Sequence, residues 1–127
     1  MNNHKYGAEP KVIDGIKFDS KAESKRYMEL KLLEKAGKIS HLILQPMFKL
    51  TSNKYIICKY YADFAYINEE GERIVEDVKG YSKGVAHQLF MIKWKLAYAQ
   101  YGKKIDRWFR IYSDQVVEGL DKRKGKR

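Results

Sequence analysis

The sequence predicts an α/β domain in which a mixed central β-sheet carries a helix on each face. Three observations lead to this fold class. Residues 19–36 and 85–101 show the apolar spacing of helices and lie between helix start and stop residues. Residues 60–80 hold two runs rich in aromatic and β-branched side chains on either side of an Asn-Glu-Glu-Gly turn, which is typical of a β-hairpin. Further strand-like runs occupy residues 39–50 and 105–112.

Size and composition indicate one folded domain. The chain has 127 residues, 44% of them hydrophobic and 33% charged, which are ordinary values for a domain with a single modest core. We expect this domain to span residues 1–120 and residues 121–127 to form a basic, disordered tail. No apolar run is as long as a membrane span, and the N-terminus has no signal-peptide segment. Cys58 is the only cysteine, which excludes an intrachain disulfide, and no Cys/His cluster suggests zinc; we expect a cytoplasmic protein.

The net charge of +10 indicates an anionic partner. The tail contributes +4 of this charge, so the rest of the chain is basic as well. Nucleic acid is the usual partner of so basic a small domain, although many small proteins are basic. A membrane surface fits less well, because no helix combines a basic face with a clean apolar one. The candidate DNA-binding residues of the tail are Lys122, Arg123 and Lys124, and a purely solubilising tail is the alternative.

The first predicted element is a short hairpin over residues 11–18, with a tight Asp14-Gly15 turn. Residues 1–10 before it are polar and expected to be mobile. The hairpin is too short to be stable alone, so it must pack on another element.

The first helix begins at Ser20 and ends at Gly37. Glu23 follows Ser20 at capping-box spacing, so its carboxylate can reach back to the Ser20 amide. Glu23 also lies on one stripe with Tyr27 and Leu30, at the edge of the helix face turned toward the protein body. A capping role and a role in a functional site therefore both stay open for Glu23.

Two strands follow the helix. Residues 39–50 predict a strand that is interrupted at Pro46, and residues 55–67 predict one long strand. Gln45 stands just before the interruption, where a loop glutamine is the simplest interpretation.

The central hairpin predicts a cluster of charged residues on one face of the sheet. A three-residue loop with Gly71 in the left-handed conformation sets the register, so that Ala65 faces Val75 and Asp63 faces Asp77. Two carboxylates directly opposite on antiparallel strands lie about 5 Å apart and repel. Lys79 projects from the same face. A divalent cation between the carboxylates would explain this arrangement, and a charged strand end facing water is the alternative.

The second helix spans residues 85–101 and ends at Gly102. Its predicted core stripe consists of Val85, Leu89, Ile92, Leu96 and Ala99. A second stripe is aromatic, with a wide core contact slightly favoured over a self-association surface; it consists of Phe90, Trp94, Tyr98 and Tyr101. Candidates for phosphate contacts, with a solvated surface as the alternative for each, are Lys83 in the preceding loop and His87, Lys93 and Lys95 on the helix.

The chain ends in a strand over residues 105–112, with Arg107 and Arg110 expected to flank the edge of the sheet. Residues 113–120 are expected to form a short terminal segment before the tail.

Four short motifs carry a family resemblance. They are FDSKAE at residues 18–23, LQP at 44–46, ADF at 62–64 and EDVKG at 76–80. In order and spacing they resemble the PD-(D/E)XK nuclease superfamily, in particular small phage-type nucleases, Holliday junction resolvases and transposon-end endonucleases. The resemblance covers residues 6–112, and the proline of the family motif is replaced by Ala62.

The resemblance implies a restriction-endonuclease-like core with a metal site. The residues that match the family's metal ligands are Glu23, Asp63 and Asp77, and Gln45 matches a supporting residue. Mg²⁺, for which Mn²⁺ can substitute, prefers such hard oxygen ligands, and the Val78 carbonyl is a further candidate ligand. Lys79 would orient or help deprotonate the attacking water, or offset charge on the phosphate.

The expected function is a Mg²⁺-dependent endodeoxyribonuclease selective for branched DNA such as four-way junctions. A small domain without a sequence-reading module suits recognition of DNA shape, and paired cuts across a junction require a homodimer. Two alternatives remain at this point. One is a non-catalytic DNA-binding protein that keeps the nuclease fold, and the other is an endonuclease subunit of a larger recombination complex.

Overall fold

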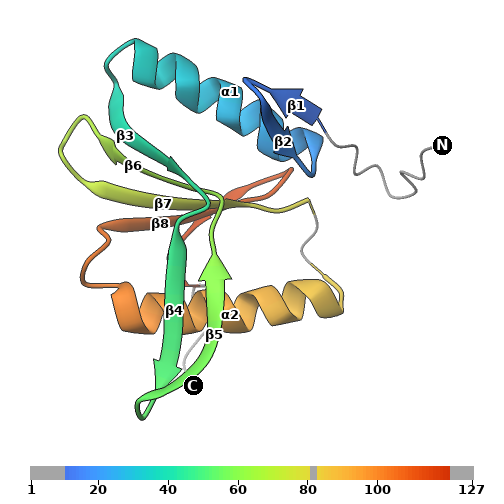
Figure 1. The fold of residues 1–127 in the computed structure, drawn as a ribbon, viewed down its shortest axis with the longest axis vertical. Coiled ribbons are helices and arrows are strands. Elements are labelled where there is room, and N and C mark those ends of the chain that lie inside the picture. The colour runs from blue at the N-terminus through green and yellow to red at the C-terminus, as the bar shows by residue number, and fades with distance from the viewer. Residues whose placement is uncertain (1–10, 81–82, 121–127) are drawn as a thin grey trace.

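The computed structural model of the protein describes residues 11–80 and 83–120, and it has a mixed α/β fold (Figure 1). Two helices and three β-sheets make up this part of the chain. The elements in chain order are β1 (Lys11–Ile13), β2 (Ile16–Phe18), α1 (Lys21–Lys35), β3 (Ile39–Leu44), β4 (Met47–Ser52), β5 (Tyr55–Tyr61), β6 (Phe64–Asn68), β7 (Arg73–Val78), α2 (Val85–Tyr101), β8 (Arg107–Ile111) and β9 (Val116–Glu118).

The central sheet has five strands in the order β3-β6-β7-β8-β9. Strands β7 and β8 are parallel and the other neighbours are antiparallel, so the sheet is mixed, as the sequence predicts. Helix α2 makes the crossover between the two parallel strands. Helix α1 lies with the β1–β2 hairpin on one side of the sheet and α2 lies on the other (Figure 1). No helix of the described residues is long and apolar enough to cross a membrane.

The register of the central hairpin β6–β7 confirms the prediction as far as Phe64, which pairs with Glu76; the predicted pair of Asp63 and Asp77 is not part of the ladder, because β6 begins at Phe64. Ala65 pairs with Val75, and the amide of Asn68 donates to the carbonyl of Glu72 at 3.0 Å. Gly71 has a φ of +83°, the left-handed conformation that a three-residue loop requires.

The predicted interruption of the strand over residues 39–50 is confirmed, because β3 ends at Leu44 and β4 begins at Met47. The prediction of one long strand over residues 55–67 is wrong, because this segment divides at Ala62 and Asp63 into β5 and β6. Strands β3 and β6 pair in the central sheet, whereas β4 and β5 leave it as a separate hairpin that packs on α2. Gln45 has a φ of +51°, and this turn of the backbone directs the chain out of the sheet.

Helix α2 buries its aromatic stripe, so the predicted core stripe is wrong, and the favoured interpretation of the aromatic stripe as a wide core contact is confirmed. Phe90 and Trp94 are buried in the main core with Trp108. Val85, Leu89 and Ile92 are 80%, 53% and 57% exposed. Aromatic side chains bury about 150–250 Å² each, so turning them inward removes more apolar surface from water than the aliphatic stripe could.

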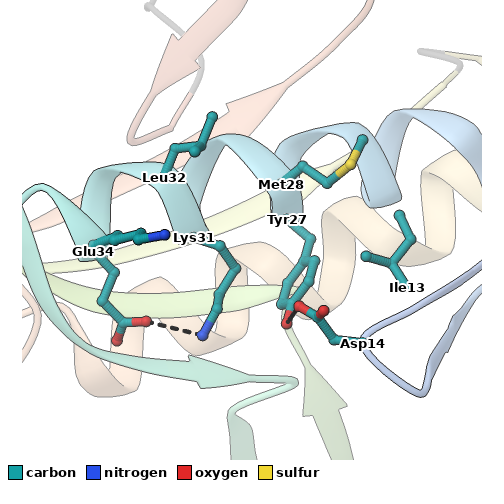
Figure 2. A pocket seen from close by; sticks show the side chains of 8 residues that line it. Ile13, Asp14, Tyr27, Met28, Lys31, Leu32 and Glu34 are labelled. Carbon is teal, nitrogen blue, oxygen red and sulfur yellow. Dashed lines mark hydrogen bonds and ion pairs between the residues drawn. The ribbon is translucent and has the colours of Figure 1, made fainter.

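Helix α1 has the predicted bounds and buried face. The side chain of Ser20 accepts a hydrogen bond from the Glu23 amide at 3.1 Å, and Tyr27 and Leu30 are buried. The Tyr27 hydroxyl donates to the Asp14 carboxylate at 2.8 Å, which ties the β1–β2 hairpin to the helix (Figure 2). This contact and burial raise the pKa of Tyr27 to about 12, with burial the larger cause.

A buried ion pair joins α1 to the sheet. The Arg26 guanidinium donates to both carboxylate oxygens of Glu76, at 2.7 and 2.6 Å, and the Tyr66 hydroxyl also donates to Glu76. Glu76 is 1% exposed and faces α1, whereas its neighbour Asp77 faces the other side of the sheet.

Replacing Arg26 with methionine should lower the free energy of unfolding by about 3 kcal/mol, because it leaves a buried carboxylate without its cation. Adding Glu76→Gln to this variant should recover part of the loss, since the buried charge is then gone. Urea denaturation of both proteins measures the effect. An Arg26→Met protein as stable as the wild type would contradict the prediction.

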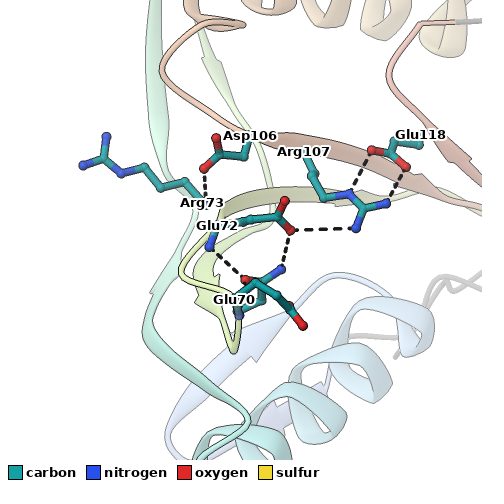
Figure 3. Close-up of polar contacts among 7 residues, drawn as sticks. Glu70, Glu72, Arg73, Asp106, Arg107 and Glu118 are labelled. Atoms are coloured by element: carbon teal, nitrogen blue, oxygen red, sulfur yellow. Dashed lines mark hydrogen bonds and ion pairs between the residues drawn. The ribbon is translucent and has the colours of Figure 1, made fainter.

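The last part of the chain adds a strand that was not predicted. Residues 116–118 form β9, which pairs with β8. Arg107 forms ion pairs with Glu118 and Glu72 at 2.9 and 3.8 Å, and so links β8 and β9 to the central hairpin (Figure 3). Arg110 does not flank the edge of the sheet, because it is only 2% exposed.

Candidate active site

Four predicted site residues meet at one end of the central sheet. Glu23 lies in the first turn of α1, and Asp63 lies in the short link between β5 and β6. Asp77 is the penultimate residue of β7, and Lys79 directly follows that strand. The split of the predicted long strand brings Asp63 here, because the link that contains it crosses the end of β7.

Asp63 lies at the centre of the cluster. Its Oδ2 accepts a hydrogen bond from the Val78 amide at 2.7 Å, which fixes the carboxyl group over the end of β7. Its side chain contacts Glu23 on one side and Asp77 on the other. Burial and then the charge of Glu23 raise the pKa of Asp63 to about 7.

Asp77 is an almost fully buried carboxyl group, only 1% exposed. The Tyr60 hydroxyl donates to its Oδ2, and the Lys79 ammonium lies 3.2 Å from its Oδ1. Among residues 11–80 and 83–120, no donor other than Lys79 reaches Oδ1. Burial and then the charge of Asp63 raise the pKa of Asp77 to about 8, so a proton or another cation is needed to hold these carboxyls together.

Ser20 caps the helix through the amide of Glu23, and no hydrogen bond from the Ser20 amide to the Glu23 carboxylate is formed among the described residues. The Glu23 backbone amide supplies the cap contact with Ser20, while the Glu23 carboxyl contacts Asp63. Burial raises the pKa of Glu23, and the charges of Asp19 and Asp77 add to this effect. A change of the Glu23 side chain therefore leaves the amide-to-Ser20 contact in place.

Lys79 is held in a defined position. Its ammonium lies 4.3 Å from the centre of the Phe90 ring, and its amide donates to the Ile111 carbonyl at 2.8 Å. An ammonium placed over a ring face is attracted by the ring's electrons. The cation therefore stays beside the carboxyl cluster instead of sampling solvent.

The donor atoms of the cluster suit a hard divalent cation. Carboxylate oxygens are the ligands that Mg²⁺ prefers, and Glu23, Asp63 and Asp77 supply them on adjoining elements. Within the described part of the chain, no three acidic, histidine or cysteine side chains stand in a ready-made metal-binding arrangement. A cation bound by these carboxyls would displace the protons that their raised pKa values favour.

Gln45 lies beside the cluster through its backbone. Its amide donates to the Asp63 carbonyl at 2.9 Å, and its side chain is exposed. It therefore positions the link that holds Asp63. Val78 likewise contributes its amide, through the hydrogen bond to Asp63.

The structure separates the predicted DNA-binding residues into groups. Lys83 and His87 line a small depression together with Lys79. His87 is half-buried and its ring bonds to the Tyr112 hydroxyl at 2.9 Å, so it is not part of a solvated face. Lys93 and Lys95 lie farther along α2 and do not line this depression. The tail residues Lys122, Arg123 and Lys124 lie outside the described residues.

Sequence reasoning did not identify Tyr60. On one continuous strand over residues 55–67, side-chain alternation places Tyr60 and Asp63 on opposite faces. The sequence therefore does not predict a contact between Tyr60 and the carboxyl cluster. The chain changes direction at Ala62, and Tyr60 then reaches Asp77 from the neighbouring β5. Burial raises the pKa of the Tyr60 hydroxyl, and the charge of Asp77 adds to the effect, so Tyr60 remains a donor.

A second concave region, between the β1–β2 hairpin and α1, contains none of the four clustered residues (Figure 2). Ile13, Met28 and Leu32 give it a largely apolar lining. The carboxyl cluster combines strongly raised pKa values with an adjacent fixed cation, which is typical of functional sites, so it is the candidate active site.

Comparisons with known proteins identify the family. The family model described as "Protein of unknown function (DUF1064)" matches residues 3–114, and the chain belongs to this family. No curated protein matches the chain. The chain is similar to the solved structure described as "Crystal structure of SSO0001", with a TM-score of 0.39 and 14% sequence identity. That match covers 76% of this chain and 48% of the other, so the chain spans about half the length of that neighbour.

Proposed function

We propose that this member of the DUF1064 family is a metal-dependent endodeoxyribonuclease with a PD-(D/E)XK-type site. One observation carries the proposal. Asp63 and Asp77, with pKa values raised to about 7 and about 8, lie together with Glu23 beside the Lys79 ammonium. Strongly perturbed carboxyls next to a fixed cation are typical of sites that work on charged substrates.

The residues that would hold Mg²⁺ or Mn²⁺ are Glu23, Asp63 and Asp77, with the Val78 carbonyl as a further ligand. Such an ion supplies charge neutralisation at the phosphate and a more acidic water. Tyr60 holds Oδ2 of Asp77 and leaves Oδ1 turned to Lys79. The Val78 amide holds one oxygen of Asp63 in the same way. Lys79 would then offset negative charge that develops on the phosphate or orient the attacking water.

The proposed substrate is DNA, selected by shape. The net charge of +10 and the cations Lys79 and Lys83 at one end of the sheet support a polyanionic substrate. Within the class we propose branched DNA such as four-way junctions, cut by a homodimer, because two symmetric cuts require two sites related by a two-fold axis.

The function is tested by incubating the protein with labelled linear, nicked, flapped and four-way DNA, with Mg²⁺ and with a chelator. We expect Mg²⁺-dependent cleavage, fastest on the four-way DNA. Glu23→Gln should abolish this cleavage at saturating DNA, while its melting temperature stays near that of the wild type because the cap uses the Glu23 amide.

Each outcome of this assay has one meaning. Cleavage that persists in the chelator, or an active Glu23→Gln protein, would refute the metal site. Binding of all four DNAs without any cleavage would indicate a DNA-binding protein. Equal cleavage of linear and four-way DNA would leave a nuclease and remove the proposed preference for branched DNA.

A further inference from the structure

The β4–β5 hairpin is a basic arm. Between Gln45 and Ala62 the sequence contains three lysines and no acidic residue. In Figure 1 the arm extends away from the central sheet and crosses α2. Its two-residue turn consists of Asn53 and Lys54, which both have positive φ values, 48° and 73°, so a lysine also stands at the tip.

Two of these lysines oppose each other. Lys49 on β4 pairs directly with Lys59 on β5, and both are exposed. Like charges at directly opposite positions destabilise a hairpin. Within residues 11–80 and 83–120, no carboxylate forms an ion pair with Lys49, Lys54 or Lys59. The arm thus carries a repulsion that an anionic partner would relieve.

The two faces of the arm differ. Phe48 and Tyr60 point into the core, so the residues that alternate with them point outward. The outward face consists of the Lys49–Lys59 pair and, next to it, the pair Met47 and Tyr61, which are 47% and 54% exposed. Exposed lysines that form no ion pair among the described residues make a surface suited to the phosphates of nucleic acid.

The base of the arm is part of the candidate active site. Asp63 directly follows the end of the arm, and the amide of Gln45 bonds to the Asp63 carbonyl. Lys59 precedes Asp63 by four residues, which span at most about 13 Å even when fully extended. Since DNA rises about 3.4 Å per base pair, the arm would contact a duplex within about four base pairs of the phosphate at the site.

We propose that the β4–β5 arm binds the DNA duplex that flanks the cut, with Lys49 and Lys59 on its phosphates. The inference rests on the proposed function for the identity of the polyanion. The major groove admits a two-stranded β-ribbon, so the arm has the dimensions to lie along it or across its edge. A second copy of the chain fits this face less well, because it would bring two more lysines against Lys49 and Lys59.

The test measures binding of a 30-base-pair duplex to the cleavage-inactive variant Asp77→Asn at several salt concentrations without metal. Adding Lys49→Gln and Lys59→Gln should weaken binding at least about tenfold and make the slope of log K against log salt shallower by about 1.8. The matched control adds Lys17→Gln and Lys35→Gln, which remove the same charge from exposed positions on β2 and α1. The control should keep the slope of log K against log salt that the Asp77→Asn parent shows.

A second readout separates binding from folding. The Lys49→Gln/Lys59→Gln protein should melt at the same temperature as its parent or higher, because the change removes a repulsive pair. Binding that is unchanged, or that falls equally in the control, overturns the proposal. A dimer that becomes monomeric on the same change, with DNA binding intact, would also overturn it and assign the arm to a second copy.

The arm and the nuclease activity can fail independently. If the wild type cuts DNA and the arm variant binds as tightly as its parent, the arm inference is wrong and the proposed function stands. If the arm variant loses DNA binding and the wild type never cuts DNA, the inference about the arm stands and the proposed function is wrong.

Discussion

Asp77→Asn should lower DNA cleavage at least about 10³-fold and at the same time stabilise the metal-free protein. The amide has the size of the carboxyl, and its oxygen can still accept the hydrogen bond from the Tyr60 hydroxyl. The variant removes a buried carboxyl that must either hold a proton or, when ionised, repel Asp63. It also loses one of the three carboxylates proposed to bind the metal, so Mg²⁺ should no longer raise its melting temperature by mass action.

The gain in stability should depend on pH in a defined direction. The folded protein holds Asp63 and Asp77 at pKa values of about 7 and about 8, whereas both lie near 3.8 when unperturbed. The folded state therefore binds more protons than the unfolded state between about pH 4 and pH 8. The stability that these groups contribute is complete below about pH 4 and is lost as the pH rises through 7 and 8.

Thermal melts from pH 5 to pH 9 without metal test this reasoning. The wild-type melting temperature should fall over this range, and the fall should be smaller in Asp77→Asn and in wild type with millimolar Mg²⁺. Asp114→Asn, a change at an exposed position, serves as the control and should follow the wild type. Identical curves for wild type and Asp77→Asn would show that the buried carboxyls are not coupled to folding.

The central hairpin could be predicted because local chemistry determines it. A loop of defined length around Gly71 sets the register, and strand alternation then places Asp77 and Lys79 on one face. The N-cap of α1 is equally local, so the position of Glu23 followed from Ser20. These local rules placed Glu23, Asp77 and Lys79, whereas Asp63 reaches the cluster through a split between β5 and β6 that they did not predict.

Features that depend on competition between surfaces could not be predicted. Helix α2 has two apolar stripes, and its rotation depends on which stripe the sheet and Trp108 accept. The choice of partner for β5 depends on the positive φ at Gln45, which no residue type at that position requires. The contact between Tyr60 and Asp77 depends on this pairing, because Tyr60 reaches Asp77 from β5, which lies outside the central sheet.

Lys79→Met should separate metal binding from cleavage. Methionine keeps the length of the side chain and its packing on Phe90, and it removes the ammonium 3.2 Å from Asp77. Cleavage at saturating DNA and Mg²⁺ should fall by about 10²–10³-fold, because the charge that develops on the phosphate loses a fixed cation.

The metal response of Lys79→Met should persist, since the three carboxylates proposed as ligands remain and a neighbouring positive charge is gone. Melting temperatures with and without Mg²⁺ measure it beside the cleavage assay, and Lys17→Met, an exposed lysine on β2, controls for the loss of one charge. A Lys79→Met protein that cleaves as fast as the control would remove Lys79 from the chemistry. One that lost the Mg²⁺-induced rise would instead make Lys79 a part of the metal site's framework, with its ammonium needed to keep Asp77 ionised and in place.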